Sequence, residues 1–116
     1  MHATAEIEDI LDANRRLGTV ADLKTAIRKT REELDEFEAE LDKGDDAKAL
    51  SELGDTLLAV HLLAGRYARE KVGSSPWMAA DEAAVKVLNR LGVIEKLVTE
   101  GTALPDAVKT AKAQYR

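Results

Sequence analysis

The chain has 116 residues, the length of one ordinary domain, and its 17 Lys and Arg against 22 Asp and Glu give a formal net charge of −5. This acidic balance argues against nucleic-acid or acidic-membrane binding that is driven by overall charge. The absence of cysteine excludes a disulfide framework and a thiolate zinc site, and the two histidines leave little for a histidine-rich metal site or a Ser/His/Asp triad. The chemistry of the chain therefore depends mostly on carboxylates, lysines and arginines.

No segment has the roughly 18 uncharged apolar residues that a membrane-spanning helix needs. The N-terminal stretch from Met1 to Asp12 carries acidic but no basic side chains, unlike a secretory signal. We therefore expect a cytoplasmic protein that binds neither membranes nor nucleic acid.

Few residues in the chain break helices, and the alternation and turn signals of β-structure are missing. We therefore predict an all-α fold of four to five helices in a single domain over residues 1–116. Thr4 can cap a first helix that Gly18 ends, and a longer helix is predicted to start at Thr19. Apolar positions in this second helix recur at heptad spacing: Val20, Leu23, Ile27, Thr30, Leu34, Phe37 and Leu41. Such a seam indicates antiparallel or dimeric helix packing.

The second and third helices are predicted to form a hairpin, because residues 43–46 (Lys-Gly-Asp-Asp) close one helix and cap the next. The third helix, about residues 47–71, is apolar around most of its circumference. A helix of this kind must be covered on several sides. In so short a chain we expect a partner subunit to supply part of the cover, so that dimerisation completes the fold.

The remaining helices follow a loop that ends at Pro76, a residue suited to a first helical turn. The fourth helix is predicted to run to about Glu100, with a weak point at Gly92. Leu104 and Pro105 open a short last helix.

Two pairs of acidic residues stand out by their position in the hairpin. Glu33 and Glu36 are three residues apart on the second helix, and Glu52 and Asp55 are three apart on the third. If Leu34 and Leu53 face the core, each helix presents two carboxylates at the edge of its buried stripe. The acids of the second helix alone are typical of a solvated face.

Glu52 and Asp55 interrupt a leucine-rich helix, where an unpaired carboxylate is costly unless a cation compensates for it. That cation is either a Lys or Arg of another helix or a metal ion. An all-oxygen set favours Mg²⁺ or Mn²⁺. A di-iron bundle would need Glu-x-x-His pairs, and the chain has none.

The acidic pattern resembles the signature of the MazG-type all-α nucleoside triphosphate pyrophosphohydrolases. Glu32-Glu33-x-x-Glu36 is followed after fifteen residues by Glu52-x-x-Asp55. The segment that starts with Glu52-Leu-Gly-Asp resembles the family's E-L-G-D-L-L-x-x-V helix. The later Lys86-Val-Leu-Asn-Arg90-Leu resembles its K-[FL]-x-R-R-[FH] segment.

The resemblance implies a helical bundle that forms a dimer or a dimer of dimers. It also implies Mg²⁺-dependent hydrolysis of an NTP or dNTP to the monophosphate and pyrophosphate, which serves nucleotide-pool house-cleaning. Carried over by position, the metal ligands would be Glu33, Glu36, Glu52 and Asp55. Glu32 would hold a further metal ion or orient the attacking water, and Lys86 and Arg90 would contact the phosphates.

Two alternatives remain open. Phosphoribosyl-ATP pyrophosphatase has a similar acidic pattern, and a non-catalytic helical interaction module would use the heptad seam and the leucine-rich helix to bind a partner.

Just before the acids lies a basic run: Lys24, Arg28, Lys29 and Arg31. We interpret this run as solvated partners of neighbouring glutamates, with phosphate contact as the alternative.

Overall fold

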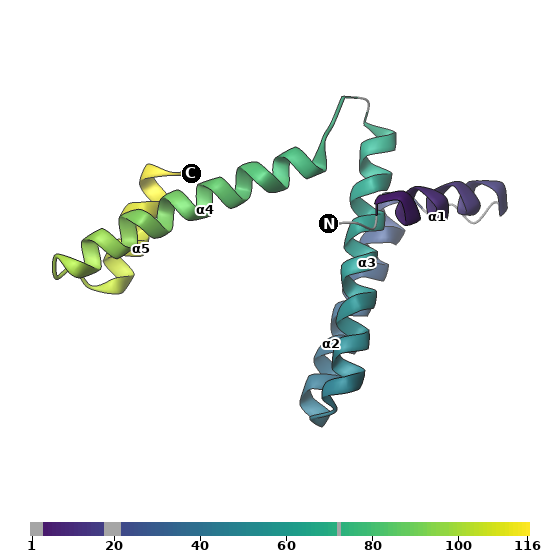
Figure 1. Ribbon diagram of the computed structural model, residues 1–116, viewed down its shortest axis with the longest axis horizontal. Coiled ribbons are helices and arrows are strands. Elements are labelled where there is room, and N and C mark those ends of the chain that lie inside the picture. Colours follow the sequence, from purple (N-terminus) through teal and green to yellow (C-terminus); the bar gives the residue numbers. More distant parts are fainter. Residues whose placement is uncertain (1–3, 18–21, 72) are drawn as a thin grey trace. The chain divides into compact units, whose positions relative to one another are not determined.

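A computed structural model describes residues 4–17, 22–71 and 73–116 of the chain. These residues form five helices and no strand, which confirms the all-α prediction (Figure 1). The helices are α1 (Thr4–Leu17), α2 (Leu23–Lys43), α3 (Asp46–Glu70), α4 (Pro76–Thr99) and α5 (Leu104–Gln114). None of the described helices is long and apolar enough to cross a membrane.

The chain divides into two compact units, Met1–Pro76 and Trp77–Arg116. The first unit holds α1, α2 and α3, and the second holds almost all of α4 together with α5. A single domain over residues 1–116 stays a prediction.

The predicted hairpin is present in the first unit, where α2 and α3 pack together (Figure 1). Gly44 ends α2 in the left-handed conformation (φ 74°), and its N–H donates to the Leu41 carbonyl oxygen at 3.0 Å. This conformation is the one that favours glycine after a helix. The carboxylate of Asp45 then accepts a hydrogen bond from the Lys48 N–H at 3.1 Å and caps α3. Two residues are therefore enough to reverse the chain.

The start of α2 differs from the prediction. The helix begins at Leu23 rather than Thr19, because the extended Asp22 accepts a hydrogen bond from the Thr25 N–H at 2.7 Å and acts as the cap. Thr19 and the predicted end of the first helix at Gly18 lie outside the described residues, as does the heptad position Val20.

Helix α1 packs on α3 at Gly65. Ile7 is 1% exposed and Leu11 7%, and a Cβ atom on Gly65 would lie 3.0 Å from Leu11 Cδ1, so a larger residue at this position would have to displace the Leu11 side chain. At the same interface the Arg69 guanidinium forms ion pairs with Glu8 and, at 2.9 Å, with Asp12. Apolar packing and charge therefore hold α1 on α3.

The second unit is a helix pair. Helix α4 continues through Gly92, so the predicted weak point does not break it. Gly101 (φ 98°) follows α4, with its N–H bonded to Val98 O and the Thr102 N–H bonded to Leu97 O, the two hydrogen bonds of a Schellman motif. Helix α5 buries Ala107 and Ala111 completely.

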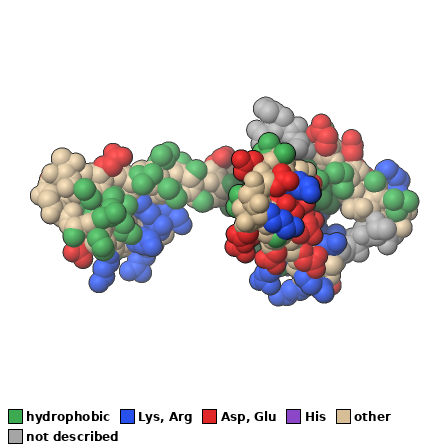
Figure 2. Space-filling model, turned by 90° about the horizontal axis from the view of Figure 1, so that it is seen from below, with side chains coloured by type: hydrophobic (Ala, Val, Ile, Leu, Met, Phe, Trp, Pro, Cys, Tyr) green, Lys and Arg blue, Asp and Glu red, His purple; other side chains and the backbone are tan. Residues whose placement is uncertain are grey.

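Much apolar surface remains exposed in both units. Leu34 and Leu41 of the heptad seam are each 53% exposed in the single chain, whereas Leu53 is half-buried, so the condition that both Leu34 and Leu53 face the core is not met within this chain alone. Figure 2 shows apolar side chains on the surface of the second unit as well. The large exposed side chains include Leu50, Leu57, Met78, Val85, Leu88 and Leu104. This surface is consistent with a partner subunit, and dimerisation stays a prediction.

Candidate metal centre

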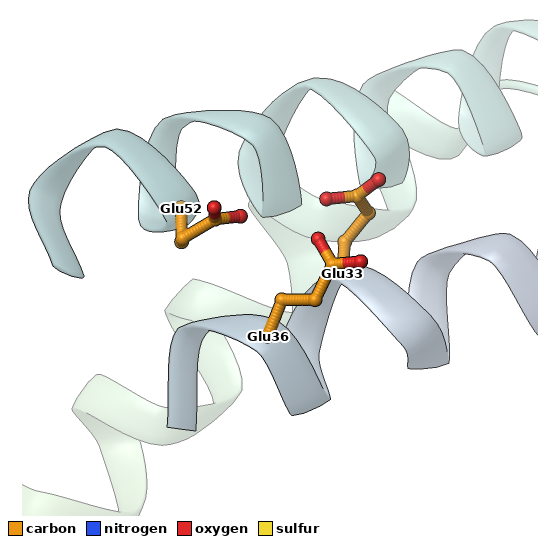
Figure 3. Close-up of side chains that lie close together, drawn as sticks. All are labelled: Glu33, Glu36 and Glu52. Atoms are coloured by element: carbon orange, nitrogen blue, oxygen red, sulfur yellow. The ribbon is translucent and has the colours of Figure 1, made fainter. Parts of the chain in front are cut away.

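Three of the predicted ligands meet between α2 and α3. One carboxylate oxygen each from Glu33, Glu36 and Glu52 lies within 4.8 Å of the other two. Figure 3 shows the three side chains directed into the space between the helices, two from α2 and one from α3. We name these three residues the carboxylate cluster.

The turn at Gly44 explains why residues of two helices meet at the same level. Glu36 and Glu52 are equally far from Gly44 along the chain, and so are Glu33 and Asp55. Positions equally far from the turn of an antiparallel hairpin lie side by side, because both helices rise by the same distance per residue. The spacing of three residues within each helix then places its two acids on neighbouring parts of one face.

The environment of the carboxylate cluster disfavours three negative charges. Burial raises the pKa of Glu33, and the nearby charges of Glu36 and Asp55 raise it further. The pKa of Glu52 is raised by the same causes in the same order. In addition, Glu52 Oε2 is buried and has no hydrogen-bond partner among the described residues. A buried carboxylate oxygen without a partner is unfavourable unless a cation or a donor reaches it.

A hard divalent cation fits this donor set. The cluster offers only oxygen atoms, from side chains that converge from two helices, which is the ligand type that Mg²⁺ and Mn²⁺ take. A bound cation would pair with the buried oxygen of Glu52 and would reduce the repulsion among the carboxylates.

The fourth predicted ligand, Asp55, lies beside the cluster. Its charge raises the pKa of both Glu33 and Glu52, and it shares a cavity with Glu33. Its oxygens are not part of the group of three. Asp55 is exposed, so its side chain has room to turn toward an ion held by the other carboxylates.

The three remaining predicted site residues are Glu32, Lys86 and Arg90. Glu32 is exposed on α2 and is not in the cluster. Lys86 and Arg90 are half-buried on α4, in the second compact unit. There Arg90 Nε donates a hydrogen bond to the Tyr115 carbonyl oxygen at 2.6 Å. Phosphate binding by Lys86 and Arg90 stays a prediction.

Sequence reasoning missed a cavity that begins at the acids. This cavity of about 520 Å³ is lined by Glu33 and Asp55 at one end, and two cations, Lys29 and Arg66, also line it. Lys29 belongs to the basic run that the sequence predicts to be solvated partners of neighbouring glutamates, and the sequence pattern assigns no role to Arg66. The signal was present, because Lys29 is one helical turn before Glu33 and Arg66 is three turns after Asp55, on the same helix faces.

The surface around the hairpin combines both signs of charge. Figure 2 shows acidic side chains gathered on this unit with basic ones among them.

No protein-family model, curated protein or solved structure matches the chain.

Proposed function

We propose that the protein hydrolyses nucleoside or deoxynucleoside triphosphates between the α- and β-phosphates, with Mg²⁺ as cofactor and Mn²⁺ as a possible substitute. The observation that carries this proposal is the carboxylate cluster with the buried, unpartnered oxygen of Glu52. The resemblance to the MazG-type pyrophosphohydrolases connects such a cluster with this reaction.

In this proposal the chain's own residues hold and orient the reactants. Glu33, Glu36 and Glu52 hold the ion, and Asp55 completes the ligand set from the next turn of α3. When bound, Mg²⁺ supplies charge neutralisation for the triphosphate and lowers the pKa of a coordinated water. Glu32 orients the attacking water. The products are the nucleoside monophosphate and pyrophosphate.

The phosphates also need positive side chains, because the chain is acidic overall and would repel a triphosphate. The resemblance assigns this role to Lys86 and Arg90. Both lie one turn apart on α4, so their side chains point to the same side of that helix. We further propose that the enzyme acts as a cytoplasmic homodimer or dimer of dimers in nucleotide-pool house-cleaning.

The first test is a product assay across the NTPs, dNTPs, dUTP, and oxidised and deaminated analogues. It runs with Mg²⁺, with Mn²⁺ and with EDTA, and measures pyrophosphate separately from orthophosphate. We expect metal-dependent pyrophosphate and a monophosphate. Release of orthophosphate instead would mean that a different phosphate bond is cleaved. If neither product is released from any nucleotide, phosphoribosyl-ATP is the next substrate to test.

The second test removes a single ligand. Glu52→Gln is expected to abolish turnover while far-ultraviolet circular dichroism still shows the helical content of the wild type. Glu38→Gln is the matched control, because Glu38 is exposed on α2 and outside the carboxylate cluster. Wild-type turnover in Glu52→Gln would refute the metal assignment.

A second candidate function is a non-catalytic helical interaction module. The exposed leucines of the hairpin favour it, since a surface of this kind is typical of a protein–protein contact. Such a module would change neither its melting temperature nor its oligomer size when Mg²⁺ is added. The enzyme is expected to be stabilised by Mg²⁺, because the ion binds the folded state only.

A further inference from the structure

We propose that the cavity beside the carboxylate cluster holds the nucleoside part of the substrate, and that Arg66 selects bases with a carbonyl group where adenine and cytosine carry an amino group. This inference rests on the proposed function and specifies its substrate class. It is carried by the position of the cavity, its apolar walls and the different surroundings of its two cations.

The cavity extends away from the acids along the hairpin. Glu33 and Asp55 line one end, and Asn14 of α1 and Arg66 of α3 line it farther along. Asp55 and Arg66 are three turns apart on α3, an axial distance of about 16 Å. Phosphates held by an ion at the carboxylate cluster would therefore direct the sugar and base toward Arg66.

The walls between these ends are apolar. They are formed by short and branched aliphatic side chains, among them Leu58, Ala59, Leu62 and Leu63 of α3. Such walls suit the faces of a base and a sugar ring, which gain from leaving water. No described aromatic residue lines the cavity, so a base would pack against leucine rather than stack on a ring.

The two cations of the cavity have different surroundings. Lys29, one turn from Glu33, is exposed and makes no ion pair with the described residues. Arg66 is only 15% exposed, and its Nε is ion-paired with Glu70 at 3.3 Å. The uncompensated charge of Lys29 therefore suits the anionic phosphates. The compensated guanidinium of Arg66 suits a neutral hydrogen-bond acceptor.

The chemistry of the guanidinium sets the base preference. An arginine side chain donates hydrogen bonds and accepts none, so the group that it meets must be an acceptor. The carbonyl oxygens of uracil, thymine, guanine and hypoxanthine fulfil this, whereas an amino group at the same place would put donor against donor.

The test compares kcat/KM for substrates that differ at one group, dUTP with dCTP and dITP with dATP, in the presence of Mg²⁺. We expect the wild type to prefer the carbonyl member of each pair by roughly tenfold to a hundredfold, the range of one hydrogen bond to a charged group. Arg66→Met is expected to remove this preference, mainly by raising the KM of the carbonyl member. Arg16→Met is the matched control, because Arg16 is exposed on α1 and does not line the cavity.

The outcomes separate this inference from the proposed function. Pyrophosphate release with equal kcat/KM for dUTP and dCTP, or a preference that persists in Arg66→Met, would overturn the inference and leave the proposed function standing. Release from no nucleotide would overturn both. If Arg66→Met does not fold, the kcat/KM values of the wild type for the two pairs still test the inference. A preference for dCTP over dUTP, or for dATP over dITP, would refute the role of Arg66.

Discussion

Replacing Glu36 by glutamine is expected to stabilise the metal-free protein. The substitution keeps the shape of the side chain and removes one charge from the carboxylate cluster. Oxygens of Glu33 and Glu36 lie within 4.8 Å of each other. At that distance two like charges repel by about 0.9 kcal/mol at the dielectric constant of water and about 3.5 kcal/mol at an effective value near 20.

The lower figure applies here, because Glu36 is exposed and water screens its charge. We therefore expect Glu36→Gln to raise the free energy of unfolding in EDTA by about 1 kcal/mol, or the melting temperature by roughly 4 °C for a chain of this size. Added Mg²⁺ should stabilise the wild type more than it stabilises Glu36→Gln. At about a hundred times its Kd it stabilises the wild type by about 2.7 kcal/mol, and the variant, which lacks one ligand, by less.

The measurement is urea unfolding followed by circular dichroism, with EDTA and with Mg²⁺. Glu38→Gln is the control, since it removes the same charge from an exposed position of α2 outside the cluster. The reasoning would be refuted if Glu36→Gln were less stable than the wild type in EDTA, or if Mg²⁺ stabilised both proteins equally.

Two further predictions concern pH and the docking of α1. The pKa values of Glu33 and Glu52 are raised in the folded protein above their ordinary value of 4.5, so the stability that these groups contribute is present below pH 4.5 and is lost as the pH rises through the raised values. In EDTA, the free energy of unfolding of the wild type, relative to that of a Glu33→Gln/Glu52→Gln double variant, should therefore fall as the pH rises from 4.5 toward neutrality. Urea unfolding at each pH measures this difference. A difference that stays constant or rises would contradict the burial of these carboxylates. Arg69→Met removes both ion pairs to α1 and should cost about 1 kcal/mol with faster hydrogen exchange in α1. Arg16→Met, at an exposed position of α1 that makes neither ion pair, should leave that exchange unchanged.

The helices and the hairpin turn could be predicted from the sequence because local signals determine them. Gly44 and Asp45 end one helix and cap the next with their own backbone and side-chain groups. The acids on both sides of that turn then meet at one level, which the equal spacing from Gly44 already indicates. Local chemistry was enough for this part of the site.

Where two local signals compete for the same helix end, the sequence pattern alone does not decide between them. Thr19 and Asp22 both qualify as caps, and the hydrogen bond from Thr25 to Asp22 decides the start of α2. Gly92 costs its helix about 1 kcal/mol relative to alanine, which the neighbouring turns outweigh.

The direction in which α2 faces depends on its neighbour, and the heptad pattern did not predict it. Thr30, Glu33 and Phe37 are half-buried, while Leu34 lies more than half exposed. Burial of a glutamate in preference to a leucine contradicts a purely hydrophobic prediction and is a departure of the kind expected at functional sites. The sequence pattern does not predict the cavity with Lys29 and Arg66 either, because three helices together form it.

The single tryptophan of the chain, Trp77, is the first residue of the second compact unit. Its fluorescence therefore reports on the surroundings of the start of α4, whereas circular dichroism follows all five helices at once. Coincident curves from the two signals mean that the chain melts in one cooperative step, and separate curves mean that the start of α4 loses its structure apart from the other helices. The sequence thus carries, without any label, an optical reporter at the boundary between the two units.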